Sequence, residues 1–199
     1  MTSEHLNDRS TSTNADLAPF AQLNLDPWMI CELRSDHAGE TGAVAIYDGI
    51  LAVAKDPQLR KFAEAHRAGE RRHLAFFEAW LPPHAKTRLA PLWKAAGFTL
   101  GALPALIGPR AVYLTIDAVE TFVEQHYQHQ LDHLDRRQDP ALRPLRERIA
   151  EFQSDEVDHR DDAKRRRGAR GARWMWIARA WSGLVGIGSA AGVVVARRV

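Results

Sequence analysis

Apolar residues recur along this chain at intervals of three and four positions, which is the spacing of one face of an α-helix. The alternation of apolar and polar residues that marks a half-buried strand is missing. In four segments these apolar residues form a stripe along one helix face over many turns. The segments lie near residues 27–54, 57–80, 109–136 and 140–170. The pattern therefore predicts an all-α fold built on four long helices.

Three of these segments begin with an acidic residue followed by proline. Asp26, Asp56 and Asp139 can each accept a hydrogen bond from a free amide of the first helical turn. The following proline suits the first helical position, because its missing N–H has no partner to lose there. Pro109 marks the start of the remaining segment in the same way.

The stripes also include charged residues, although an unpaired charge on a buried face is costly. The first and third helices carry a lone glutamate, and the second and fourth carry the motif Glu-x-x-His. These candidates are Glu40, Glu70, His73, Glu120, Glu156 and His159. Positions i and i+3 share one helix face, so each motif presents a carboxylate and an imidazole to one point.

A single Glu-x-x-His arises by chance on charged surface helices. Two copies, each preceded by a glutamate that lies within an apolar stripe, indicate a metal site. Four carboxylates and two imidazoles are the ligands of di-iron or di-manganese centres in four-helix bundles. We expect Glu70 and Glu156 to bridge the two ions. The remaining ligands then form one pair for each ion: Glu40 with His73, and Glu120 with His159. Ligand type does not separate iron from manganese.

Two aspartates are candidates to orient the ligand histidines, which need a partner on the second ring nitrogen. Asp155 is expected to point across the bundle and to reach Nδ1 of His73. Asp36 is expected to reach His159 in the same way. The alternative for both aspartates is a salt bridge to Arg34 or to another arginine.

Cys31 is the only cysteine of the chain. An internal disulfide, a cysteine-based zinc site and a cysteine-ligated iron–sulfur cluster are therefore excluded. Any metal ion must be held by nitrogen and oxygen atoms, and Cys31 is expected to be a small buried apolar residue.

Charge is distributed unevenly along the chain. Residues 160–199 contain ten Lys or Arg and two Asp, so the preceding residues carry a net negative charge. The polar lead, residues 1–24, lacks the apolar segment of a secretory signal and is expected to be disordered. A bundle with the metal site follows over 25–170, and a basic-flanked apolar helix over 171–199.

Within the bundle, residues 91–109 form an apolar crossover that carries one charge, Lys94, and several glycines and prolines. We expect a short kinked helix here, too short and too interrupted to span a bilayer. This crossover would either cap the bundle core or face lipid, by dipping into a membrane surface or lining a channel for a lipid substrate.

The C-terminal residues 180–196 are free of charge and are flanked by basic residues. Trp174, Trp176 and Trp181 cluster at the start of this region, where interfacial aromatic residues are typical of membrane helices. We expect a membrane-associated helix whose basic flanks contact anionic lipid, with a further core helix as the alternative. Its length of 17 residues leaves open whether it spans the membrane or lies on it.

Several of these segments together resemble the demethoxyubiquinone hydroxylase family. The most specific is residues 33–43, L-R-S-D-H-A-G-E-T-G-A, and it is joined by Ala-Val-Glu at 118–120, His-Tyr at 126–127 and Asp-Glu-x-x-His at 155–159. The resemblance runs from about residue 25 to the C-terminus. It implies a ferritin-like four-helix bundle with a long apolar crossover and an additional C-terminal helix.

The resemblance implies a membrane-bound di-iron monooxygenase of ubiquinone biosynthesis, whose iron ligands fall on the six residues named above. Such an enzyme uses O2 to hydroxylate a polyprenyl benzoquinol ring. His126 and Tyr127 match the family's His-Tyr pair, which is expected to carry protons or electrons to the ring. The family often has two acidic residues where this chain has Glu120 and Thr121, so one ligand candidate remains there.

NADH is expected as the ultimate reductant, although no nucleotide-binding fold is predicted. Residues 186–191 match the loose dinucleotide fingerprint, but no strand precedes them, so we reject that interpretation. Electrons would then arrive through the quinone or through a partner protein.

The expected partners are the polyprenyl quinone, membrane lipid, other proteins of ubiquinone biosynthesis and a second copy of the chain. Nucleic acid is not expected, because the basic residues flank an apolar segment, which also argues against a hydroxylase acting on tRNA. The expected location is the cytoplasmic face of a bacterial inner or plasma membrane, as a peripheral protein. The main alternative is a ferritin-like iron oxidase or peroxide scavenger, and a quinone-binding scaffold without catalysis is another.

Overall fold

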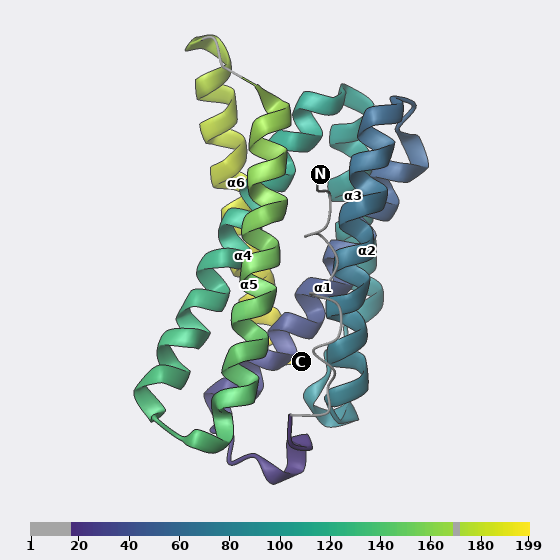
Figure 1. Cartoon of the computed structure of the whole chain (residues 1–199). Coiled ribbons are helices and arrows are strands. Elements are labelled where there is room, and N and C mark those ends of the chain that lie inside the picture. Colours follow the sequence, from purple (N-terminus) through teal and green to yellow (C-terminus); the bar gives the residue numbers. More distant parts are fainter. Residues whose placement is uncertain (1–16, 169–171) are drawn as a thin grey trace, which may run out of the picture.

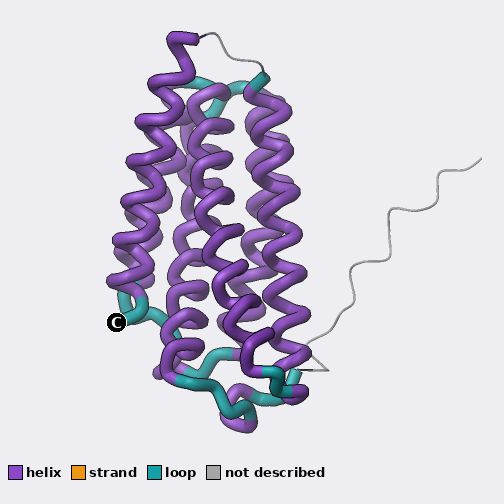
Figure 2. The backbone as a smooth tube through the Cα atoms, turned by 90° about the vertical axis from the view of Figure 1, so that its left-hand side faces the viewer, coloured by secondary structure: helices purple, strands orange, loops and turns teal. Residues whose placement is uncertain are grey.

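The computed structural model describes residues 17–168 and 172–199, and these contain helices and no strands (Figure 2). The long helices are α1 (Pro27–Val53), α2 (Pro57–Trp80), α3 (Ala90–Ile107), α4 (Pro109–Arg137), α5 (Arg143–Arg167) and α6 (Ala172–Ala196). Short 3-10 helices are η2 (Phe20–Gln22), η3 (Pro83–Ala85) and η4 (Pro140–Leu142). The prediction of an all-α fold is confirmed.

Four of the helices form the bundle. α1 pairs with α2, and α4 pairs with α5, while α3 carries the chain from one pair to the other (Figure 1). α3 packs along α1, and α6 packs mainly along α4, so both additional helices cover the outside of the bundle. This is the ferritin-like bundle with a crossover and an additional C-terminal helix that the sequence predicts.

The capping aspartates act largely as expected. The Asp26 carboxylate accepts a hydrogen bond from the amide of Met29 at 2.9 Å, and that of Asp56 accepts one from Leu59 at 2.7 Å. Asp139 instead caps the short η4, so the fourth bundle helix begins at residue 143, slightly later than predicted.

The crossover differs from its prediction. α3 is continuous over 18 residues, so the expectation of a short helix was wrong. Pro91 lies in the first turn of α3, where its missing N–H has no partner to lose. Pro104 lies inside the helix near its C-terminal end, where the missing N–H leaves the carbonyl of Leu100 without its usual helical donor. By length and composition, α3 and residues Arg179–Ala196 of α6 could each cross a membrane, which overturns the expectation that the crossover is too short.

Two glycines allow α3 to lie unusually close to α1. A Cβ added at Gly97 would collide with the carbonyl oxygen of Gly42, and one added at Gly101 would collide with that of Ile46. Glycine is needed at such positions because any side chain would force the two backbones apart.

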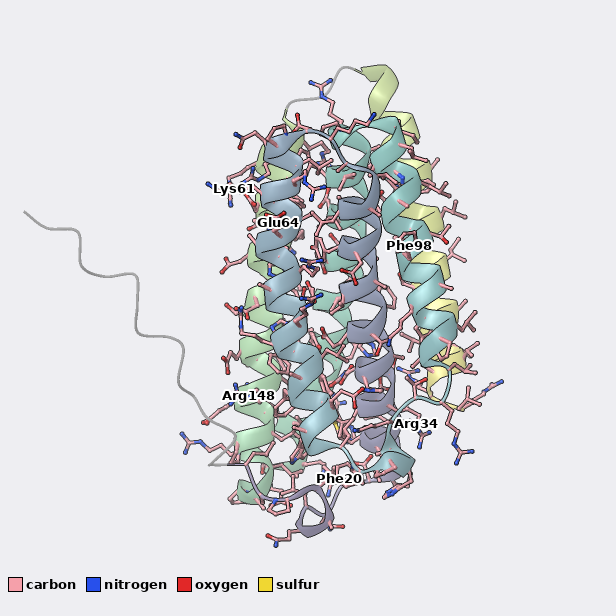
Figure 3. All side chains as sticks on the ribbon, turned by 90° about the vertical axis from the view of Figure 1, so that its right-hand side faces the viewer. Phe20, Arg34, Lys61, Glu64, Phe98 and Arg148 are labelled. Atoms are coloured by element: carbon pink, nitrogen blue, oxygen red, sulfur yellow. The ribbon has the colours of Figure 1, made fainter. Side chains whose placement is uncertain are left out.

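Part of the polar lead is ordered. Residues 1–16 lie outside the described part of the chain, and so do the side chains of Trp174 and Trp176. Leu23 is buried, and the Phe20 ring packs edge-on against Trp80 at 5.4 Å between centroids, at the end of the bundle (Figure 3). The packed structure therefore begins before residue 25, where the predicted boundary lay.

The bundle core consists of two apolar clusters. One contains Leu33, Phe77, Leu131, Leu145 and Phe152 among others. The other includes Ile46, Ile50, Phe62, Ile116 and Ala163. On each bundle helix the predicted ligands lie in the sequence between the residues of these two clusters, so a polar layer separates them.

Candidate metal centre

The structure brings all six predicted ligands together in this layer. Each is buried, with at most 9% of its surface exposed: Glu40, Glu70, His73, Glu120, Glu156 and His159. α1 and α4 each contribute one glutamate, and α2 and α5 each contribute one Glu-x-x-His pair, because the three-residue spacing places both side chains on the inner helix face.

The ligand atoms form two groups, and within each group they lie within 4.8 Å of one another. The first group is Glu40, Glu70, His73 and Glu156, and the second is Glu70, Glu120, Glu156 and His159. Glu70 and Glu156 belong to both groups. This grouping matches the arrangement that the spacing predicts, with two shared carboxylates between two separate pairs.

The donor atoms also fit a pair of divalent cations. Several buried polar atoms of the layer have no hydrogen-bond partner in the described residues: Oε2 of Glu40, Oε1 of Glu70, Nδ1 of His73, both carboxylate oxygens of Glu156 and Nδ1 of His159. Leaving so many buried polar atoms unsatisfied is costly. Metal ions would satisfy them, and carboxylate oxygen with imidazole nitrogen suits iron or manganese.

The electrostatics of the metal-free layer support the same conclusion. Burial and the nearby Glu156 charge raise the pKa of Glu70 to about 8, and burial raises the pKa of Glu120 well above its usual range. Burial opposes a charge on His159, but Glu156 and Glu70 raise its pKa to about 11. Without bound cations this layer would hold protons, and divalent cations would displace them.

Asp155 lies beside a ligand histidine, as predicted, but it contacts the other ring nitrogen. Its Oδ2 is 3.0 Å from Nε2 of His73, so the prediction of Nδ1 was wrong. The geometry explains the difference, because Nδ1 of His73 faces the carboxylates and lies 3.1 Å from Oε1 of Glu156. Asp155 thus leaves Nδ1 free to bind a metal ion.

The prediction for Asp36 was wrong. Its carboxylate points toward α4, where Oδ1 accepts a hydrogen bond from Gln130 at 2.8 Å and lies 3.0 Å from Nε2 of His126. Burial disfavours a charge on His126, but the hydrogen bond to Asp36 raises its pKa. Asp36 therefore orients His126 instead of His159.

His159 is positioned by packing. A Cβ added at Gly69 would lie 3.1 Å from Cε1 and Nε2 of His159, so Gly69 leaves the space that this ring occupies. The His66 ring packs edge-on against it at 4.4 Å between centroids. No sequence signal distinguished Gly69, because its role depends on His159, which lies 90 positions away on another helix.

Two tyrosines bind ligand carboxylates across the bundle. The Tyr127 hydroxyl donates to Oε1 of Glu40 at 2.6 Å, and the Tyr47 hydroxyl donates to Oε1 of Glu120 at 3.3 Å. The sequence analysis did not identify Tyr47 as a functional residue. A signal was present, since each tyrosine follows a ligand glutamate by seven positions, or two helical turns.

A cavity of about 410 Å³ reaches this layer from the side covered by α3 and α6. Its inner end is formed by ligand carboxylates, including Glu40 and Glu120, and by His126 and Tyr127. The outer walls are almost wholly apolar and come from α1, α3, α4 and α6. The cavity therefore joins an apolar surface to the candidate metal centre.

Comparisons with known proteins identify the family of this chain. The family model of "Ubiquinone biosynthesis protein COQ7" matches residues 28–196. The 3-demethoxyubiquinol 3-hydroxylase of Rhodospirillum rubrum is 38% identical over 170 residues, which cover 84% of this chain and 76% of the relative.

Mitochondrial relatives are similar over shorter stretches. The NADPH-dependent 3-demethoxyubiquinone 3-hydroxylase of Dictyostelium discoideum is 37% identical over 134 residues, covering 64% of this chain and 59% of the relative. The human protein of the same name is 33% identical over 131 residues, covering 65% of this chain and 60% of the relative. The chain belongs to the ubiquinone biosynthesis protein COQ7 family.

Proposed function

We propose that this protein is a di-iron monooxygenase that uses O2 to hydroxylate the ring of a demethoxyubiquinol. The observation that carries the proposal is the apolar cavity whose inner end is formed by Glu40 and Glu120. A polyprenyl benzoquinol has an apolar tail and a polar ring, and the cavity offers an apolar path with polar groups at its end. The names of the relatives describe hydroxylation of a demethoxyubiquinol or a demethoxyubiquinone.

In this proposal the two ions are iron. Glu70 and Glu156, which belong to both groups of donor atoms, would hold both ions. The other ligands would hold one ion each, as the pairs Glu40 with His73 and Glu120 with His159. Bound iron would supply the electrons that activate O2, which a carboxylate-rich site supports because carboxylates shift as the metal charge changes. Asp155 orients the His73 ring through its hydrogen bond to Nε2.

His126 and Tyr127 are the proposed catalytic residues for proton or electron transfer to the ring. Both line the cavity, and the Tyr127 hydroxyl donates to Glu40, so a hydrogen-bonded path runs from the cavity wall to a ligand. Asp36 keeps His126 ready to hold a proton, because its carboxylate stabilises the charged imidazole. Tyr47 does not line the cavity and is assigned to positioning Glu120.

The substrate would enter from lipid between α3 and α6. Both helices expose large apolar residues on the outside of the bundle: Leu92, Phe98, Leu103, Leu106 and Ile107 on α3, and Leu184, Ile187, Val194 and Val195 on α6. Figure 3 shows Phe98 pointing away from the bundle, on the side opposite Lys61 of α2. Such a patch is typical of a membrane contact.

We infer that α3 and α6 lie on the membrane surface and do not span it. Both run alongside α1 and α4, so a bilayer crossed by α3 and α6 would also enclose the charged bundle. A peripheral position on the cytoplasmic face of a bacterial inner or plasma membrane follows as our proposal. Association with other proteins of ubiquinone biosynthesis, or with a second copy, stays a prediction.

The reductant is proposed to be a nicotinamide nucleotide that acts through the quinone or a partner protein. The sequence resemblance implies NADH, whereas the names of the mitochondrial relatives specify NADPH. The described residues contain no strand and therefore no nucleotide-binding βαβ unit.

Metal analysis, a Mössbauer spectrum and an assay with demethoxyubiquinol test the proposal. We expect about two irons per chain and O2-dependent hydroxylation in the wild type. Glu70→Gln should lose iron and activity, whereas Glu64→Gln, on the exposed side of the same helix, should lose neither. Iron uptake followed by iron oxidation without quinol hydroxylation would favour the ferritin-like alternative.

A further inference from the structure

α6 forms one wall of the cavity, and it packs against the bundle mainly along α4. In the middle of α6, the Trp181 indole donates a hydrogen bond to Oγ1 of Thr115 at 2.9 Å, and Val185 is buried. From Val185 to its C-terminal end, α6 continues to line the cavity. The lining residues in this part are Gly188, Ser189, Gly192, Val193 and Ala196, and the last of these is buried.

The C-terminal end of α6 is attached by polar contacts. Nη2 of Arg197 lies 2.6 Å from Oε1 of Glu32 on α1. Nη1 of Arg34 donates to the carbonyl oxygen of Arg197 at 3.1 Å, and the amide of Arg88 donates to that of Val199 at 3.2 Å. Figure 3 shows Arg34 at the end of the bundle where α6 also ends.

Glu32 has an unusual environment for a carboxylate outside the metal ligands. Only 1% of its surface is exposed, and a buried carboxylate is strongly destabilising unless a cation lies beside it. Arg197 supplies such a cation at one carboxylate oxygen, and its own side chain is 37% exposed at the surface. The ion pair therefore joins the C-terminal end of a cavity wall to the interior of α1.

The same carboxylate lies close to the proposed catalytic residues. Oε2 of Glu32 is 3.5 Å from Nε2 of His126, which in turn lies 3.0 Å from Oδ1 of Asp36. Asp36 and His126 both line the cavity. A displacement of the C-terminal end of α6 would therefore alter the cavity wall in two ways: directly, because α6 lines the cavity, and through the contact of Glu32 with His126.

We propose that the Arg197–Glu32 ion pair is a clasp that holds α6 closed over the cavity, which makes Arg197 a positioning residue for the substrate. The proposal rests on the proposed function for the identity of the substrate. Its structural part, the closure of α6, does not depend on that function.

Hydrogen exchange of the full-length, iron-loaded protein in nanodiscs tests the clasp directly. Arg197→Gln should raise the exchange rate of amides 188–196 about tenfold, a typical coupling for a close charge pair. Arg197→Lys keeps the charge and should restore most of the protection. Arg198→Gln is the matched control, because the Arg198 side chain forms no ion pair with the described residues, and it should exchange like the wild type.

Steady-state kinetics test the positioning role. Arg197→Gln should raise KM for demethoxyubiquinol about tenfold and change kcat less, with unchanged iron content. A merely structural defect would instead lower kcat and iron content together. If Arg197→Gln folds poorly because Glu32 is left unpaired, the double variant Glu32→Gln/Arg197→Gln removes both charges and should still show fast exchange in α6.

Equal exchange of amides 188–196 in Arg197→Gln and Arg198→Gln would overturn the clasp. An enzyme without quinol hydroxylation would overturn the proposed function, but the exchange result would still decide whether the ion pair closes α6.

Discussion

At the scale of single residues, the candidate metal centre depends on groups that do not bind the metal. Asp155 holds Nε2 of His73, Tyr127 and Tyr47 donate to ligand glutamates, and Gly69 leaves room for His159. Each of these contacts limits the orientation of one ligand. Their loss should weaken the site without removing a donor atom.

Asp155→Asn provides one such test. An amide lacks the negative charge that favours the required tautomer of His73, so iron affinity should fall about tenfold to a hundredfold. Asp158→Asn is the control, because Asp158 is exposed on the same helix. Competition with a chelator followed by metal analysis measures the effect, and equal iron retention in both variants would refute the role of Asp155.

The negative charge of the Asp26 carboxylate stabilises the fold itself. Burial acts against its charge, but the Met29 amide, His133 and Arg137 together lower its pKa from 3.8 to about 2. Because the pKa of Asp26 is lower in the folded state than in the unfolded state, the charge stabilises the folded state at pH values above the unfolded pKa. This contribution is present above about pH 4 and is lost as the pH falls toward 2.

Asp26→Asn keeps a capping oxygen and removes only the charge. Because part of the carboxylate is exposed, we expect a loss of about 1 kcal/mol in unfolding free energy near neutral pH. The difference from the wild type should shrink as the pH falls below 4. Urea unfolding at several pH values measures it. Asp56→Asn, at a cap without a cationic partner in the described residues, should lose less.

At the scale of helices, the close contact of α3 with α1 determines where the crossover lies. Gly101→Ala would place a Cβ against the carbonyl oxygen of Ile46, and the resulting shift should cost about 1–3 kcal/mol. Thermal unfolding of the iron-loaded protein measures the loss. Gly183→Ala meets no atom within 4 Å and should not destabilise the protein, so a similar loss in both variants would argue against the close contact.

At the scale of the whole molecule, the exposed apolar residues lie on one side and the charged helices on the other. Leu106 and Ile107 are 69% and 78% exposed on α3. The double variant Leu106→Glu/Ile107→Glu should reduce binding to anionic vesicles at least about tenfold, since burying each such side chain contributes about 1.5–3 kcal/mol.

Lys61→Gln is the control for membrane binding. Lys61 lies on the opposite side of the bundle (Figure 3), and its loss also makes the net charge of the protein less positive. Vesicle flotation should show full binding for this variant. An equal loss of vesicle binding in both variants would show that net charge, and not an apolar membrane contact, causes the loss.

The sequence by itself determined the features that depend on neighbours along the chain. A three-residue spacing places Glu70 and His73 on one helix face, and an aspartate before proline begins α1 and α2. Apolar periodicity placed the four bundle helices within a few residues of their observed bounds. These features could be predicted because helix geometry is local and repeats every 3.6 residues.

Only the tertiary structure decided which distant residues meet. Asp36 contacts His126, 90 positions away, and not His159, because the rotation of α1 turns it toward α4. The close approach of α3 to α1 depends on glycines that fit against α1, and α6 completes the cavity wall. Helix rotation and packing distance follow from the shapes of all the side chains between two helices, and no local spacing contains that information.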